Sequence, residues 1–207
     1  MTKNPTVLIT YANLLRNVRI VSAPDSTLLT YDEAEDKAEA YRQAWSAKEQ
    51  LILDGMQTCM DLTFAAPVID VAVAPWQYDW AAISFPLILD MAHEPDAFID
   101  ILTHELFHVL FADNQIITSK NQRAQSRLQW EKLFGEEHSG GTLVHIAVHA
   151  ALKYMYLDIH KEPYRLTRDI ERSRQYPDYQ QAWDYVEQHD YRDIIAKLKQ
   201  RYQEIAA

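Results

Sequence analysis

Two histidines and a glutamate with the spacing of metal-site residues stand near the middle of this chain, in the segment His104-Glu105-Leu106-Phe107-His108. Residues four apart on an α-helix are neighbours, with Cβ atoms about 5–6 Å apart. This suits two imidazole nitrogens that each bind one Zn²⁺ at about 2.0–2.1 Å. Glu105 follows the first histidine directly, so its carboxylate can reach a metal-bound water as a general base. A helix here would therefore present a metal centre that activates water.

The residues around this segment are apolar nearly all round, at 97–103 and again at 109–112. Such a pattern is typical of a buried helix. Polar groups without partners are costly in apolar surroundings. A metal removes that cost for the imidazoles, and its charge keeps a nearby carboxylate ionised. We therefore favour a metal site over the alternative, in which the two histidines are ordinary hydrogen-bonded core residues and Glu105 is paired or at the surface.

A third ligand must come from elsewhere, because a catalytic zinc ion takes three protein ligands and leaves one position for water. His145 and His149 are the leading candidates, since they lie four residues apart on one face of a helix expected at residues 143–159. His149 is slightly favoured because it lies deeper in that helix, farther from Gly140 and Gly141. The other histidine can then hydrogen-bond a ligand or donate to a substrate oxyanion.

A closed site is the main alternative to a catalytic one. Zinc held by four histidines has no open position and is structural; the four would be His104, His108, His145 and His149. His93 and His138 are weaker candidates because they lie in loop-like sequence, where surface histidines are common. Tyr154 and Tyr156 share the expected ligand helix, where a phenol could stabilise an oxyanion, although core packing is the simpler role.

Local signals delimit the two helices that would carry these residues. Pro95 can open the first helix, because proline is tolerated in a first turn, and this helix is expected to run to about Asp113. Paired glycines make residues 136–141 a loop. Thr142 is then expected to cap the helix at 143–159, which should pack beside the first one.

Further helices are expected on both sides of this region. Thr30 and Glu33 form a capping-box pattern, and apolar residues near a 3.6-residue period extend the following helix to about Met60. A polar stretch at 118–129 precedes a short helical pattern at 130–134. Beyond Pro163 the helical patterns lie at 164–173, 179–187 and 191–202.

The sheet is expected to be small. Residues 67–74 and 84–91 are β-like, and both end near turn residues. Pro86 cannot donate to a ladder, which places the second strand at an edge or leaves it paired only beyond that residue. Weaker strand signals lie at 7–11 and 18–21.

Chain length, hydrophobic content and net charge limit the domain organisation and the kinds of binding partner. The 207 residues, 48% of them hydrophobic, are enough for one domain with a sizeable core. Lys and Arg total 20 against 30 Asp and Glu, and the net charge of −10 argues against nucleic acid or an anionic membrane as partner. No apolar run approaches the roughly 18–20 residues of a membrane span, and the first residues do not read as a signal peptide. We therefore expect a cytoplasmic protein that acts on neutral or basic substrates.

The single cysteine, Cys59, limits the metal chemistry. It cannot form an intramolecular disulfide or a thiolate zinc site, so any zinc must be held by histidine and carboxylate. We expect Cys59 to be a small core residue rather than a nucleophile.

At the segment His104–His108 the chain resembles the zincin superfamily of zinc metallopeptidases. In zincins the motif helix packs beneath a sheet whose edge strand binds extended substrate, and the order of strands before helix agrees. The metzincin branch would require Gly at 111 and His at 114, where this chain has Phe111 and Asn114. The chain is more similar to gluzincins, in which a later helix carries the third ligand, although His145 or His149 stands where those families use Glu.

The resemblance implies an α+β, zincin-like fold over residues 1–162, with a small mixed sheet, a backing helix, the motif helix and a later ligand helix. Residues 163–207 would form a helical extension packed on the same domain. The implied function is zinc-dependent hydrolysis of peptide or protein substrates with Glu105 as general base. The alternative is a non-catalytic, zinc-stabilised binding module with a closed four-histidine site. In a third arrangement the extension covers a competent site until a partner or a cleavage displaces it.

Overall fold

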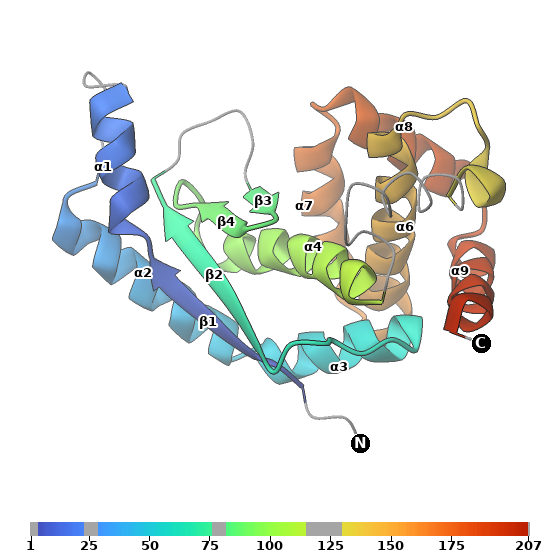
Figure 1. Ribbon diagram of the computed structural model, residues 1–207, viewed down its shortest axis with the longest axis horizontal. Helices are drawn as coiled ribbons and strands as arrows, with labels where there is room; N and C mark the ends of the chain where they lie inside the picture. The colour runs from blue at the N-terminus through green and yellow to red at the C-terminus, as the bar shows by residue number, and fades with distance from the viewer. Residues whose placement is uncertain (1–3, 23–28, 76–81, 115–129, 207) are drawn as a thin grey trace. The chain divides into compact units, whose positions relative to one another are not determined.

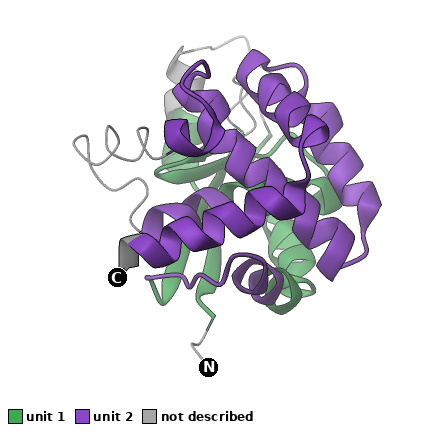
Figure 2. Ribbon diagram, turned by 90° about the vertical axis from the view of Figure 1, so that its right-hand side faces the viewer, with its two compact units in different colours: residues 1–52, 66–106 green, residues 53–65, 107–207 purple. Residues whose placement is uncertain are grey.

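The computed structural model describes residues 4–22, 29–75, 82–114 and 130–206 (Figure 1). The chain divides into two compact units, residues 1–52 with 66–106 and residues 53–65 with 107–207 (Figure 2). The division falls within helix α3 (Glu49–Met60) and within helix α4 (Pro95–Asp113), each of which is continuous. Residues 163–207 lie in the second unit together with 107–162.

The first unit contains a small mixed sheet of strands β1 (Thr6–Tyr11), β2 (Val68–Ala74), β3 (Ala82–Ser84) and β4 (Leu87–Asp90). Their order is β1-β2-β4-β3. β1 and β2 are parallel, as are β2 and β4, whereas β3 runs antiparallel to β4 at the edge of the described sheet. The predicted α+β class with a small mixed sheet is therefore confirmed.

Helix α2 (Tyr31–Ser46) packs on this sheet and lies behind β1 in Figure 1. The predicted capping box is present: the Thr30 hydroxyl accepts a hydrogen bond from the Glu33 amide, and the Glu33 carboxylate accepts one from the Thr30 amide at 2.7 Å. The face that α2 buries comprises Ala34, Ala38, Tyr41 and Trp45. The Tyr41 hydroxyl donates to the His93 carbonyl at 2.6 Å, and its ring stacks on Phe98 at the start of α4.

The single long helix predicted from residue 30 to about Met60 is wrong, because the structure has two helices there. α2 ends at Ser46, and α3 begins at Glu49. At the junction the Lys48 amide donates to the Trp45 carbonyl at 2.8 Å, a tighter turn than the α-helical one. The apolar period continues through the break, which is why periodicity alone did not reveal it.

Two strand predictions also need correction. Residues 84–91 form a hairpin rather than one strand: Ser84 of β3 pairs with Leu87 of β4, and Pro86, with a cis peptide bond before it, occupies the turn. Proline lacks the amide proton that a central ladder position needs, so the turn accommodates it. Residues 18–21 belong to helix α1 (Asn13–Ser22) and are not a strand, whereas the strand at 7–11 is confirmed as β1.

The second unit is helical. It contains α6 (Gly140–Tyr154), the π-helical segment η1 (Met155–Ile159), α7 (Pro163–Ser173), α8 (Pro177–Gln188) and α9 (Tyr191–Ala206). Residues 130–134 are helical as predicted, and the polar stretch predicted at 118–129 lies outside the described residues. The three C-terminal helices predicted from sequence are confirmed. Among the described helices, none is both long enough and apolar enough to cross a membrane.

The start of α6 differs from its prediction. Ser139, not Thr142, is the N-cap, because its hydroxyl accepts a hydrogen bond from the Thr142 amide at 3.0 Å. The two glycines therefore lie in the first turn of the helix rather than in the preceding loop. A serine at the N-cap satisfies a helix amide that would otherwise lack a partner, and this outweighs the low helix propensity of Gly140 and Gly141.

Candidate metal centre

Helix α4 places the two motif histidines one turn apart, with Glu105 between them. Its bounds, Pro95–Asp113, match the prediction, and Phe98 donates the first helical hydrogen bond to the Glu94 carbonyl at 2.9 Å. All three motif side chains are buried, with exposed fractions of 2% for His104 and 7% each for Glu105 and His108. Ionisable groups this deeply buried require polar partners or a metal.

Helix α6 supplies the other two predicted histidines. Both are buried, and His145 has a defined orientation because its Nδ1 lies 2.7 Å from the Gly141 carbonyl oxygen. A carbonyl can only accept, so Nδ1 carries the proton and donates it. The remaining ring nitrogen, Nε2, then has a lone pair for a metal, which is how ligating histidines are usually oriented.

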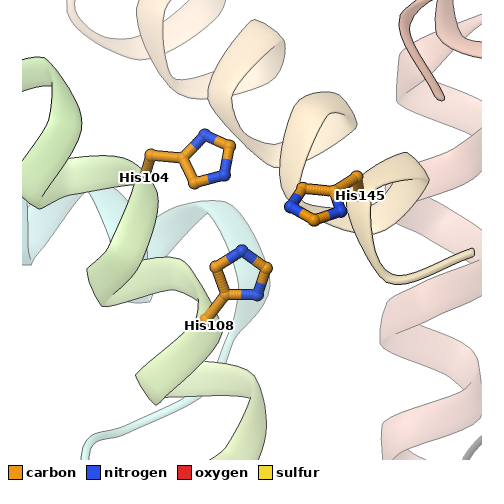
Figure 3. Close-up of side chains that lie close together, drawn as sticks. All are labelled: His104, His108 and His145. Carbon is orange, nitrogen blue, oxygen red and sulfur yellow. The ribbon is translucent and has the colours of Figure 1, made fainter. Parts of the chain in front are cut away.

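The imidazoles of His104, His108 and His145 converge (Figure 3). Their ligand atoms all lie within 4.8 Å of one another, and in the close-up one nitrogen of each ring faces the space between the three rings. The ring centroids of His108 and His145 are 5.0 Å apart. Three buried imidazoles in this arrangement match the donor set that proteins use for a catalytic zinc ion.

His149 lies in a second group rather than the first. Its ligand atom is within 4.8 Å of those of His104 and Asp169. The sequence slightly favours His149 as the third ligand, whereas the structure places His145 with the motif pair. His149 is fully buried and its ring stacks on Trp183, with centroids 4.1 Å apart and planes 8° from parallel.

Asp169 of α7 is a site residue that the sequence reasoning missed. It is fully buried, pairs with Arg172, and lies 3.5 Å from the Ser173 hydroxyl. The signal that could have revealed it is a four-residue repeat of polar side chains on α7, in which Arg165, Asp169 and Ser173 are all buried. A carboxylate beside two imidazoles can accept an imidazole N–H or complete a metal shell.

Glu105 has a partner from the sheet of its own unit. The Ser84 hydroxyl, at the end of the edge strand β3, donates to Glu105 Oε2 at 2.5 Å. A carboxylate that accepts a short hydrogen bond is held in one orientation. Sequence reasoning missed Ser84 because the contact joins residues 21 positions apart.

The weaker candidates lie outside both groups of potential ligands. His138 is near Glu137, and neither it nor His93 belongs to either group. Tyr156 is buried and Tyr154 is half-buried. The ring of Tyr179 in α8 lies against that of His145, with centroids 3.7 Å apart.

Cys59 is a buried thiol, as predicted. It is fully buried, and its sulfur lies 3.6 Å from the Ala151 carbonyl oxygen. Burial raises the pKa of the Cys59 thiol far above its usual value, so the nucleophilic thiolate is disfavoured. The described histidines and carboxylates therefore form the candidate metal site without a thiolate.

Gly141 offers a test of how α6 holds His145. A Cβ at this position would overlap the carboxylate of Asp178, whereas a Cβ at Gly140 would meet nothing within 4 Å. We expect Gly141→Ala to displace the Asp178 carboxylate, which accepts a hydrogen bond from Ser139 at the start of α6, and so to disturb the turn whose carbonyl orients His145. If the histidine cluster holds a metal ion, this change should weaken metal binding about 10–100-fold, as for other changes to residues that orient metal ligands. Competition with a chromophoric chelator measures the affinity. Gly140→Ala is the matched control, and equal affinities for the two variants would contradict this account.

Comparison of the chain with protein-family models, with curated proteins and with solved structures gives no match.

Proposed function

We propose that this protein is a zinc-dependent peptidase. The observation that carries the proposal is the convergence of His104, His108 and His145, with Glu105 on the same helix as the first two. Three neutral imidazoles suit Zn²⁺ and leave one coordination position open. A carboxylate adjacent in sequence to the first ligand is the arrangement in which a general base serves a zinc site.

The chemistry would divide between the metal and Glu105. Zn²⁺ supplies a Lewis acid that polarises the scissile carbonyl and lowers the pKa of a water to about 7. Glu105 would take a proton from the attacking water at a carboxylate oxygen and pass it to the nitrogen of the leaving amine. The hydrogen bond from Ser84 to Oε2 orients the carboxylate and leaves Oε1 to carry the proton.

The edge strand β3 supports a peptide as substrate. It ends at Ser84, which contacts the proposed base, and within the described sheet it pairs only with β4. An extended peptide can pair with such an edge through its own backbone, which would place a peptide bond near Glu105. The net charge of −10 favours neutral or basic peptides.

The order of the elements along the chain also supports a zincin-like site. A mixed sheet with an antiparallel edge strand precedes the helix that carries the motif. We therefore propose a zincin-like site in which His145 takes the place of the gluzincin glutamate. The similarity of order supports this proposal, and the histidine is its departure from the family pattern.

A zinc-stabilised binding module is the second candidate function. His149 and Asp169 lie close to His104, so more buried donors are present than an open site needs. If they bind the same ion as the other histidines, the shell is closed and the metal is structural. The two candidates differ in one measurable property, turnover of peptide.

Metal analysis combined with a peptidase assay tests the proposal. Protein purified without chelators is expected to hold about one zinc ion per chain and to cleave members of a mixed peptide pool, as read by mass spectrometry. Removing the zinc with a chelator should abolish cleavage, and adding zinc back should restore it. Zinc without cleavage would favour the binding module, and a folded protein that binds no zinc would refute both candidates.

A further inference from the structure

We propose that helix α8 is a wall of the metal centre, and that Tyr179 and Trp183 are positioning residues for the two imidazoles of α6. This inference rests on the proposed metal site and deepens it. It concerns contacts inside the second unit, where α6 and α8 pack against each other.

Each histidine of α6 packs closely against one aromatic ring of α8, and the Tyr179 ring also lies 5.9 Å from that of His149. The Tyr179 ring lies against His145, with centroids 3.7 Å apart and planes inclined by 32°. The Trp183 ring stacks on His149 at 4.1 Å and 8°. The two histidines are four residues apart on α6, and the two aromatic residues are four apart on α8. Successive turns of α6 therefore lie beside successive turns of α8.

Contacts between α6 and α8 continue beyond these ring pairs, and the two helices run in the same direction. At the start of α6 the Ser139 hydroxyl donates to Asp178 Oδ1 at 2.8 Å. Toward the end of α6, Lys153 Nζ donates to the Val186 carbonyl at 3.5 Å. The two histidine–aromatic pairs lie between these contacts, so α8 follows the ligand-bearing face of α6 from its cap to its last turn.

Ring packing of this kind limits the motion that matters most for a metal ligand. An imidazole reorients by rotation about its terminal side-chain torsion, which is a broad torsion with few intrinsic restraints. His145 is held at Nδ1 by the Gly141 carbonyl and across its face by the Tyr179 ring. His149 and Trp183 are both fully buried, so neither ring can turn without disturbing the other.

Metal binding and the packing of α8 should therefore stabilise each other, because a ligand stabilises the conformation that binds it. This differs from the expectation that the C-terminal helices cover a finished site and can be displaced. On that expectation, loosening α8 would raise activity. If α8 instead positions the histidines of α6, weakening the packing of α8 should lower the affinity for the metal.

The test uses the full-length protein with one substitution at a time. Tyr179→Leu and Trp183→Leu remove a ring, whereas Tyr179→Phe and Trp183→Phe keep an aromatic face. We expect zinc affinity to fall about 10–100-fold in Tyr179→Leu, as for other residues that orient metal ligands, and to fall less in Trp183→Leu, because His149 lies in the second group of potential ligands. It should stay close to wild type in the phenylalanine variants. The visible spectrum of the Co²⁺-substituted protein should change only in the leucine variants, because it reports ligand geometry.

Tyr185→Leu is the matched control for helix packing, because Tyr185 is an aromatic residue of α8 whose ring contacts are with Phe134, His138 and His189. It should lower stability without changing zinc affinity or the Co²⁺ spectrum. Equal weakening in Tyr185→Leu, or unchanged affinity in Tyr179→Leu and Trp183→Leu, would overturn the inference while wild-type zinc binding still supported the metal site.

A metal-free readout separates this inference from the proposed function. In the apoprotein the Tyr179 ring current should shift the ring-proton resonances of His145, and Tyr179→Leu should abolish that shift while Tyr179→Phe retains it. A wild-type protein that binds no zinc would refute the proposed function. Resonances of His145 that are the same in wild type and Tyr179→Leu would refute the positioning by α8.

Discussion

Replacing Glu105 with glutamine is expected to leave zinc binding intact and to lower kcat for peptide hydrolysis by about 10²–10⁴-fold, the usual contribution of a general base. Glutamine has nearly the same shape as glutamate and can still accept the hydrogen bond from Ser84, but its amide cannot take a proton from water. Zinc content by mass spectrometry and kcat on a peptide found in the pool assay are the two measurements.

Glu94→Gln is the matched control for the loss of one negative charge. Glu94 lies immediately before α4 and is exposed, so the same chemical change is made away from the motif. This variant should keep wild-type kcat and zinc content. Wild-type turnover by the Glu105→Gln variant would contradict the role assigned to Glu105, and loss of its zinc would show that Glu105 acts as a ligand instead.

Replacing His104 with alanine is expected to have the largest effect on metal binding. His104 belongs to both groups of potential ligands, the one with His108 and His145 and the one with His149 and Asp169. The affinity loss should exceed the roughly 10–100-fold typical of residues that only orient ligands. His145→Ala should follow it closely, and His149→Ala should lose less if His149 orients rather than ligates.

Thermal unfolding gives an independent measure of the same loss. Zinc at about 100 times its Kd stabilises a protein that binds it only when folded by about 2.7 kcal/mol, so wild-type Tm should rise on zinc addition. That rise should vanish in His104→Ala and persist in His189→Ala, because His189 is exposed and lies in neither ligand group. A full zinc-induced rise in the His104→Ala variant would exclude His104 as a ligand.

The sequence predicted well those features that depend on near neighbours in the chain. The capping box at Thr30, the extent of α4 and the helices after Pro163 follow from caps, prolines and apolar spacing within a few residues. The one-turn separation of His104 and His108 is likewise a property of any α-helix. Each of these was correct because a local rule and the tertiary structure agree there.

The prediction was wrong where it overlooked a local turn or a nearby capping residue. The break between α2 and α3 lies at Ala47 and Lys48, where the apolar period continues but the backbone makes a tighter turn. Pro86 was assigned to the edge strand itself, although it lies in the turn between two strands. Ser139, rather than the predicted Thr142, is the N-cap of α6. In the first two cases the prediction missed a break inside a predicted element, and in the third it placed the helix cap three residues too late.

By itself, the sequence determined that two imidazoles and a carboxylate share one buried helix, and that a second helix carries two more histidines four residues apart. Only the tertiary structure decided that His145 joins the motif pair, that His149 joins Asp169, and that aromatic rings of α8 cover both histidines. The physical reason is that helical periodicity fixes which residues of one helix share a face. The rotation and register of one helix against another depend on packing between residues far apart in the chain.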